Sequence, residues 1–205
     1  MIKIYGRRSS INVRKVLWCC EELSLGYDRE DWGAGFRSTQ SPEFLALNPN
    51  GLVPVIDDQG YVLWQSNAIV RYLANCYGGA ALYPDNARIR GQIDQWIDWQ
   101  ATELNDSWRY CVMGLVRKSS VHQDPVAIQA STDQWSKSMA ILEAQLSQTT
   151  GYLVGDRFTL ADIPIGLSVH RWFAAPISRP SLPAIARYYQ LLNEREGFRR
   201  QIDEA

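Results

Sequence analysis

The residues best suited to chemistry lie in one stretch, where a proline interrupts an apolar run. Residues 52–56 are apolar and rich in β-branched side chains, which predicts a strand, yet Pro54 inside this run has no N–H to donate. If the Val53–Pro54 peptide bond is cis, the chain turns sharply and leaves the N–H and C=O of Val53 facing outward. Those two groups can pair with an extended peptide, in the manner of an added β-strand.

A helix start follows and supplies the second half of this candidate site. Turn residues 57–60 separate the first run from a second apolar run at 61–64, so the pair predicts a hairpin. Ser66 and Asn67 then offer caps for a helix that ends at glycines 78–79. Because the N-terminus of a helix favours a carboxylate, the residues favour a small peptide with carboxylates as ligand. A Val-Pro edge strand before a capped helix is also ordinary structure.

Composition indicates a globular protein and gives no electrostatic case for nucleic acid. The chain has 205 residues, 46% of them hydrophobic and 21% charged, with a net charge of −1. No secretory signal region and no run of about 20 apolar residues is seen. We therefore expect a cytoplasmic protein with no membrane partner. The cysteines form no C-x-x-C pair and are too few for a disulfide framework: Cys19, Cys20, Cys76 and Cys111.

The first half of the chain alternates strands and helices. A strand at 2–5 precedes a helix whose apolar face runs from Val13 to Leu23; a strand at 27–32 and a short helix within 36–47 follow. Two strands that flank a helical crossover imply a parallel pair, whereas the later hairpin is antiparallel.

Beyond the hairpin and its helix, the patterns indicate only helices. Apolar spacing predicts one long helix over 89–115, and residues 124–125 start another. Thr159 and Asp162 form a capping-box-like pair that begins a further helix. The expected division is a first domain at 1–79, a linker at 80–85 and an all-helical domain at 86–205.

Motifs in both halves resemble the cytosolic glutathione transferase family. The run Asn48-Pro49-x-Gly51-x-Val53-Pro54-x-Ile56, followed by Gln65-Ser66-x-Ala68-Ile69-x-x-Tyr72-Leu73, is similar to the glutathione-binding half of that family. The segment from Thr159 to Asp162 resembles the capping motif of its helical domain. The resemblance covers nearly the whole chain. It implies the glutathione transferase fold, an α/β thioredoxin-like N-terminal domain plus an all-α C-terminal domain, and a serine-type, theta-like enzyme.

Such an enzyme must ionise the thiol of glutathione, because the thiolate is the nucleophile. Lowering a thiol pKa by about 2 units from about 8.5 takes about 2.7 kcal/mol. A hydroxyl that donates to the charged sulfur supplies about 1.5–3 kcal/mol, and a helix N-terminus adds roughly 0.3–1 kcal/mol. The chemistry therefore needs a hydroxyl where the first strand passes into the first helix.

Ser10 is the preferred candidate for that hydroxyl. Residues 10–16 resemble the serine-class pattern, in which a basic residue and an apolar helix face follow the catalytic serine. Asn12 is expected to orient or supplement the hydroxyl. Ser9 and Tyr5 are the alternatives, and a plain N-cap is the ordinary role of Ser10.

The resemblance also implies the residues that hold glutathione. The main chain of Val53, next to Pro54, would bind the cysteinyl backbone, and Gln65 and Ser66 would bind the γ-glutamyl end. Thr39 would donate to the glycyl carboxylate.

Several positions depart from the family pattern. Many members carry Glu at Gln65 and a basic residue at Leu52, and related members have histidines where this chain has Thr39 and Gly51. The missing charges predict weaker or differently held glutathione. Arg7 and Arg37 are candidates to compensate.

A pocket for a small hydrophobic electrophile is expected between the domains. Its candidates are Trp108, Met113 and Trp172, although aromatic and Met residues at helical spacing are more often core. His122 and His170 have no partner pattern for metal or acid–base work, and no metal is expected.

The resemblance further implies a homodimeric detoxification enzyme. A surplus of aromatics agrees with a homodimer: Trp32, Trp64, Trp96 and Trp99. Two rival functions stay open. One is glutathione-dependent isomerase, peroxidase or dehalogenase chemistry, and the other is a non-catalytic binding or assembly module.

Overall fold

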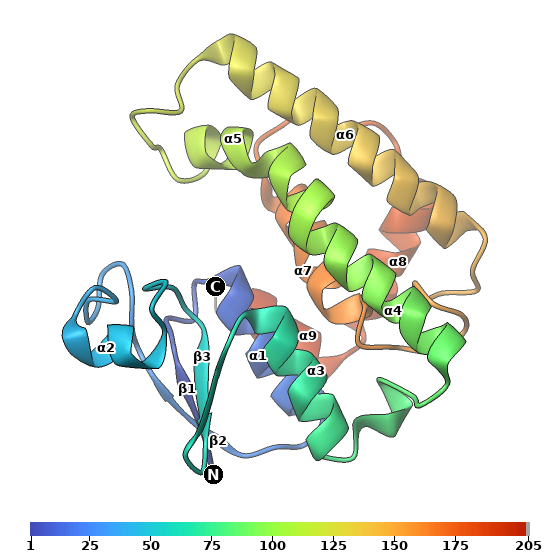
Figure 1. Ribbon diagram of the computed structural model, residues 1–205. Helices are drawn as coiled ribbons and strands as arrows, with labels where there is room; N and C mark the ends of the chain where they lie inside the picture. Colours follow the sequence, from blue (N-terminus) through green and yellow to red (C-terminus); the bar gives the residue numbers. More distant parts are fainter. Residues whose placement is uncertain (204–205) are drawn as a thin grey trace. The chain divides into compact units, whose positions relative to one another are not determined.

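The computed structural model describes residues 1–203, and its contacts divide them into two compact units (Figure 1). Unit 1 comprises residues 1–85 and 194–203, and unit 2 comprises residues 86–193. The expected division differs from this grouping, because residues 194–203 pack with unit 1 rather than with the helices that precede them. The last two residues of the expected C-terminal domain, 204–205, lie outside the described residues.

Unit 1 is built on a mixed four-stranded sheet with the order β2-β1-β3-β4. β1 and β2 are parallel, whereas β3 is antiparallel to both β1 and β4, so the predicted parallel pair and hairpin are confirmed. The strands are β1 (Ile2–Tyr5), β2 (Tyr27–Glu30), β3 (Val55–Asp58) and β4 (Tyr61–Trp64).

The strand expected at 52–56 is wrong in position, because β3 begins only at Val55. Pro54, which cannot donate to a ladder, immediately precedes the strand and therefore interrupts no strand pairing. The side-chain amide of Asn48 donates to the carbonyl of Leu52 at 2.7 Å, which holds this segment in a loop instead.

Helices cover both faces of the sheet (Figure 1). On one face α2 packs over a cluster that includes Trp32, Phe44 and Val55. On the other face α1 packs against both α3 and α9. The helices of unit 1 are α1 (Ile11–Glu22), α2 (Pro42–Leu47), α3 (Ser66–Cys76) and α9 (Glu196–Ile202), with a 3₁₀ turn at Gly79–Ala81.

α1 is buried on more sides than its apolar spacing predicted. Trp18 is fully buried because α9 brings Phe198 against it, with ring centroids 4.9 Å apart. Cys19 and Cys20, on the same helix, are buried and reduced. The burial of Trp18 shows that α9 forms part of the core of unit 1.

Unit 2 is helical throughout its regular elements. They are α4 (Ala87–Trp99), a π-helical segment (Gln100–Leu104), α5 (Asn105–Leu115), α6 (Pro125–Ser147), α7 (Asp162–Ala174) and α8 (Pro183–Asn193). The one long helix expected over 89–115 is therefore interrupted. Buried Gln100 starts the π-helical segment, and its amide donates to Asn105 Oδ1 and to Ser168 Oγ, both at 3.0 Å.

The predicted pair at the start of α7 forms around a fully buried carboxylate. Asp162 accepts from the N–H and hydroxyl of Thr159 at 2.8 and 3.0 Å, from the N–H of Leu153 at 3.1 Å and from the hydroxyl of Tyr188 at 2.9 Å. These bonds tie the helix start to the preceding loop and to α8. Burial nonetheless raises the pKa of Asp162 to about 6.

Within residues 1–203, no helix is both long enough and apolar enough to cross a membrane.

Candidate functional site

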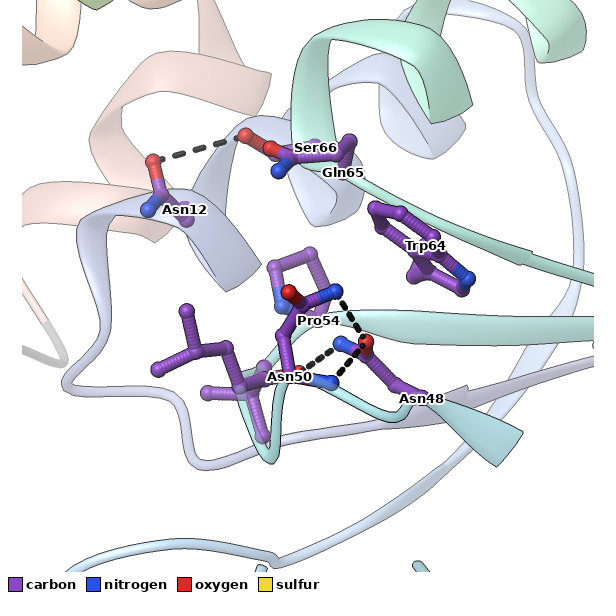
Figure 2. Close-up of a pocket in the computed structure, with 9 residues that line it drawn as sticks. Asn12, Asn48, Asn50, Pro54, Trp64, Gln65 and Ser66 are labelled. Atoms are coloured by element: carbon purple, nitrogen blue, oxygen red, sulfur yellow. Dashed lines mark hydrogen bonds between the residues drawn. The ribbon is translucent and has the colours of Figure 1, made fainter. Parts of the chain in front are cut away.

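A pocket in unit 1 brings together three segments that are distant in the sequence (Figure 2). These segments are the start of α1, the loop before β3, and the junction between β4 and α3. The lining residues are Asn12, Asn48, Asn50, Leu52, Val53, Pro54, Trp64, Gln65 and Ser66. The structure thus gathers Asn12, Val53, Pro54, Gln65 and Ser66, five of the seven residues that the sequence predicted.

One buried amide shapes the loop before β3. Asn48 Oδ1 accepts from the N–H of Asn50 at 3.0 Å and from its side-chain amide at 2.9 Å, while Asn48 Nδ2 donates to Leu52 (Figure 2). Gly51 has a φ of +61°, and a Cβ there would lie only 2.2 Å from Gln40 Nε2. A side chain at position 51 would therefore displace the Gln40 side chain and would sit on a backbone conformation that favours glycine.

The loop delivers an unpaired backbone segment to the pocket. The Val53–Pro54 bond is cis, as the hypothesis from the sequence stated. No hydrogen bond joins the N–H or C=O of Val53 to another residue in the part of the chain that the structure describes. These two groups are thus available to an extended peptide.

The N-terminus of α3 forms the opposite wall. Gln65, with a φ of +74°, is the N-cap, so the prediction that Ser66 or Asn67 caps this helix is wrong. The reason is that both side chains are engaged elsewhere. The buried hydroxyl of Ser66 donates to Asn12 Oδ1 at 3.4 Å, and Asn67 Oδ1 accepts from Lys15 Nζ at 3.2 Å. The first N–H groups of α3 are left for an acceptor from outside the helix.

The pocket has no ionisable side chain among the described residues that line it. Arg7 and Arg37, the expected compensating charges, do not line it either. Arg7 donates to the carbonyl of Ala34 at 3.3 Å, and Arg37 forms ion pairs with Glu30 and Glu43 at 3.2 and 3.0 Å. Helix dipole, amides and main chain therefore provide the polarity of this site.

Ser10 lies at the N-terminus of α1 as its N-cap, two residues before Asn12. Its N–H donates to the carbonyl of Arg7 at 3.1 Å, and its carbonyl accepts from the N–H of Arg14 at 3.0 Å. Its hydroxyl makes no capping hydrogen bond to the helix. The Ser10 side chain therefore does not perform the ordinary function of an N-cap. Ser10 is not among the residues that line the pocket.

A glycine holds the start of α1 close to the Val53 loop. A Cβ on Gly6 would lie 2.5 Å from Val13 Cγ2 and 3.0 Å from Val53 Cβ. Glycine at this position therefore lets the end of β1, the first turn of α1 and the peptide-pairing segment pack together.

The rival hydroxyls are in different surroundings. Tyr5 packs edge-on to Trp32 at 6.5 Å, and burial, followed by the charge of Asp57, raises the pKa of its phenol. Ser9 is exposed. Thr39 is half-buried and does not line the pocket, although its carbonyl would lie 3.1 Å from a Cβ on Gly51.

Four lining residues escaped the prediction from the sequence as binding residues: Asn48, Asn50, Leu52 and Trp64. The two asparagines lie within the family motif at 48–56. Their amide side chains next to a glycine could have indicated that they line the pocket. Trp64 was interpreted as an apolar strand residue and as part of the aromatic surplus, but it ends β4 directly before the α3 cap.

The electrophile candidates all belong to unit 2, where the two tryptophans among them join an aromatic cluster. Trp172 is buried and packs edge-on to Trp135, with centroids 4.8 Å apart. Trp108 lies 6.2 Å from Trp135 and under the guanidinium of Arg171 at 4.3 Å. Met113 is half-buried. The buried position of Trp172 fits the core role that was its alternative.

The two histidines have ordinary polar neighbours. His122 Nδ1 lies 2.8 Å from Ser119 Oγ, and His170 Nδ1 lies 2.9 Å from the hydroxyl of Tyr189. No cluster of metal-ligating side chains is found within residues 1–203.

A thioredoxin-like sheet with a peptide-pairing loop beside a helix N-terminus, followed by a helical unit, defines the class of glutathione transferases. The sequence pattern of the glutathione S-transferase N-terminal domain matches residues 1–75, and that of the C-terminal domain matches residues 110–196. The chain therefore belongs to the glutathione S-transferase family, and its function is that of a glutathione transferase.

Relatives and solved structures extend this likeness over the whole chain. Glutathione S-transferase GstB of Escherichia coli K12 is 38% identical over 204 residues, which cover 98% of each chain. A theta class glutathione S-transferase from Xanthomonas axonopodis pv. citri, crystallised with glutathione bound, is 41% identical with a TM-score of 0.93, covering 100% of this chain and 98% of that one. Elongation factor 1-gamma 2 of Oryza sativa subsp. japonica is 28% identical over 82% of this chain and 40% of its own length.

Proposed function

We propose that this transferase binds glutathione in the unit 1 pocket and that the hydroxyl of Ser10 stabilises its thiolate for attack on a small apolar electrophile. One observation carries the proposal. Ser10 is the N-cap of α1, yet its hydroxyl forms no capping bond, and the pocket-lining Asn12 lies two residues away. A hydroxyl that is not used for folding is available to donate to a substrate anion.

Glutathione binding is proposed to use backbone groups and amides. The N–H and C=O of Val53, beside Pro54, pair with the cysteinyl residue in strand-like fashion. The carboxylate of the γ-glutamyl residue accepts from the first N–H groups of α3, next to Gln65 and Ser66. Thr39 is proposed to donate to the glycyl carboxylate. The solved relative with glutathione bound supports this tripeptide as the ligand.

The catalytic step is the ionisation of the bound thiol. The thiol proton leaves to solvent, and the sulfur anion accepts a hydrogen bond from Ser10, worth about 1.5–3 kcal/mol. The N-terminus of α1 adds roughly 0.3–1 kcal/mol. Together these approach the 2.7 kcal/mol that corresponds to a pKa decrease of about 2 units. Asn12 orients or supplements the hydroxyl. The sulfur then forms a bond to the electrophilic carbon, by addition or with departure of a leaving group.

The electrophile is proposed to contact side chains of unit 2. Trp108 and Met113 are the better candidates, because both are only partly buried, whereas Trp172 is enclosed in the core. Glutathione-dependent isomerase, peroxidase or dehalogenase chemistry is the rival to transfer, since each begins from the same thiolate.

A binding or assembly role without catalysis is the second candidate. Two observations favour it, the likeness to elongation factor 1-gamma and the uncharged lining of the pocket. Retention on immobilised glutathione, with elution by free glutathione and turnover of a generic aryl halide, supports the enzyme. Retention without turnover supports the second candidate.

In the cell we propose a cytoplasmic homodimer that detoxifies small hydrophobic electrophiles. The support is family membership and the apolar side chains that remain exposed on unit 1, which are considered in the Discussion.

Ser10→Ala tests the catalytic proposal. The variant should raise the pKa of bound glutathione by about 1–2 units and lower turnover at neutral pH roughly tenfold or more. Affinity for glutathione should change little, because other groups hold the tripeptide. The measurement is the absorbance of the bound thiolate against pH.

Tyr5→Phe and Ser9→Ala serve as matched controls, since each removes one nearby hydroxyl. Both should titrate like the parent, and Asn12→Ala should show an intermediate shift. If Ser10→Ala leaves the titration unchanged while a control shifts it, the assignment of Ser10 is wrong.

A further inference from the structure

The C-terminal helix α9 is hydrogen-bonded to residues on both sides of Ser10. Arg8 Nη2 donates to the carbonyl of Arg200 at 2.7 Å, and Arg14 Nη1 donates to the carbonyl of Gln201 at 3.0 Å. Both carbonyls belong to the last turn of α9, where the helix itself offers no N–H partner. Arginine side chains at this position also complement the negative end of the helix dipole.

α9 is itself fixed along the length of α1. At its first turn, Arg195 forms an ion pair with Glu22, with Nε 3.0 Å from Oε1. In its middle, Phe198 packs on Trp18, and Gly197 allows this approach because a Cβ there would lie 2.9 Å from Trp18 Cδ1. The last turn of α9 is therefore a rigid support rather than a loose end.

The sheet restrains only the first part of the loop that carries Ser10. The N–H of Gly6 donates to Glu30 at 2.8 Å and the N–H of Arg7 donates to Trp32 at 3.1 Å. From Arg8 onward, hydrogen bonds tie this segment to α9 through Arg8 and Arg14, and to α3 through Asn12 and the hydroxyl of Ser66. Arg14 is nearly buried, so its bond to Gln201 is shielded from water.

We propose that Arg14 and Arg8 are positioning residues for Ser10 and that the last turn of α9 is the support through which they act. The inference rests on the proposed function, in which Ser10 donates to the thiolate. A hydrogen bond to an anion weakens steeply when donor distance or angle changes, and a displacement of about 1 Å at a reacting group can cost about a hundredfold in rate. Two arginines that span Ser10 limit such displacement.

The test measures the pKa and turnover of bound glutathione in Arg14→Ala and Arg8→Ala. Each variant should raise the thiol pKa by roughly 0.5–1 unit and lower kcat about three- to tenfold, with KM for glutathione nearly unchanged. Because Arg8 is near the surface, its variant remains informative if Arg14→Ala folds poorly. If bound glutathione has the same thiol pKa in both variants as in the parent protein, the proposal is wrong.

Arg195→Ala is the matched control. It removes an arginine bond between the same two elements, but at the first turn of α9, far along α1 from Ser10. It should lower the melting temperature, because an ion pair between α1 and the start of α9 is lost, while leaving the thiol pKa at the parent value. An equal pKa shift in all three variants would show that loosening α9 acts on the whole fold, and would overturn the positioning role.

A double-mutant cycle separates positioning from a direct effect of the Arg14 charge on the sulfur. If Arg14 acts through the Ser10 hydroxyl, adding Arg14→Ala to Ser10→Ala should raise the thiol pKa no further. An equal shift in both backgrounds would assign the effect to charge and contradict the inference. If Ser10→Ala alone shifts nothing, the proposed function fails instead, so the two failures are distinguishable.

Discussion

The amide side chains of Asn12, Asn48, Asn50 and Gln65 give the proposed glutathione pocket an unusual character. Glutathione carries two carboxylates and an ammonium group, yet these lining residues offer hydrogen bonds without a formal charge. Interactions between exposed charges are screened by salt, whereas neutral hydrogen bonds are affected much less. The pocket should therefore bind glutathione with little dependence on ionic strength.

Replacing Gln65 by Glu tests this character directly. The new carboxylate would face the γ-glutamyl ammonium at the rim of the pocket, so Gln65→Glu should increase affinity a few-fold at low salt. The gain should disappear at high salt, where the parent affinity stays nearly constant. Calorimetric titration at two ionic strengths provides the measurement. A parent affinity that falls strongly with added salt would reveal a charged contact beyond the lining residues.

At the scale of elements, the start of α7 depends on one buried carboxylate with a perturbed proton affinity. The pKa of Asp162 is raised from its ordinary value of 3.8 to about 6 because burial disfavours the charged form more than its hydrogen bonds favour it. Between these two pH values the folded chain holds the proton more tightly than the unfolded chain. The contribution of Asp162 to the free energy of unfolding therefore decreases as the pH rises from about 4 to about 6.

The variant Asp162→Asn tests the predicted decrease in the free energy of unfolding with rising pH. The variant does not titrate at this position, so its stability should fall less than that of the parent across the same pH window. At neutral pH it should still be the less stable protein by about 1–3 kcal/mol, because an amide cannot accept from all the donors around Asp162. Denaturant unfolding of both proteins at several pH values measures the two effects. Parallel pH profiles would contradict the raised pKa.

Local patterns in the sequence predicted elements that depend on neighbours in the chain. The parallel pair, the hairpin and the Thr159–Asp162 start of α7 all have short-range signals and all form. The family motif also located most of the pocket, including Val53 and Ser66.

What the sequence did not reveal depends on partners that are far away along the chain. The interruption at Gln100 depends on Ser168, 68 residues later, and periodicity carries no trace of that contact. The placement of α9 depends on Arg195 with Glu22, 173 residues apart. Asn48 and Asn50 were not predicted as lining residues, because a side chain's orientation follows from loop closure rather than from residue type.

At the scale of the whole molecule, the aromatic surplus is smaller than the sequence suggested. Trp32 and Trp96 are buried within the single chain, so they need no partner subunit. Other apolar side chains of unit 1 remain exposed, including Phe36 at 57%, Leu52 at 62% and Tyr61 at 51%. Exposed side chains of this size favour a further protein surface as their cover.

The homodimer prediction therefore rests on these side chains and on the family. Sedimentation equilibrium at micromolar concentration should give a mass near two chains, and dilution should lower it only at much smaller concentrations. Added salt should not dissociate the dimer, since apolar contacts strengthen rather than weaken in salt. A mass near one chain would count against the prediction.

The packing of α9 in unit 1 also sets an order of events during synthesis. The sheet, α1 and α3 leave the ribosome before unit 2, but Trp18 lacks its contact with Phe198 until residues 194–203 have been made. Unit 2, by contrast, is one uninterrupted stretch and can complete itself earlier. Synthesis of unit 1, which carries the proposed glutathione site, thus begins before that of unit 2 and ends after it. A nascent chain that stops after residue 193 would contain every residue of the pocket and still lack the Phe198 ring that packs on Trp18 of α1.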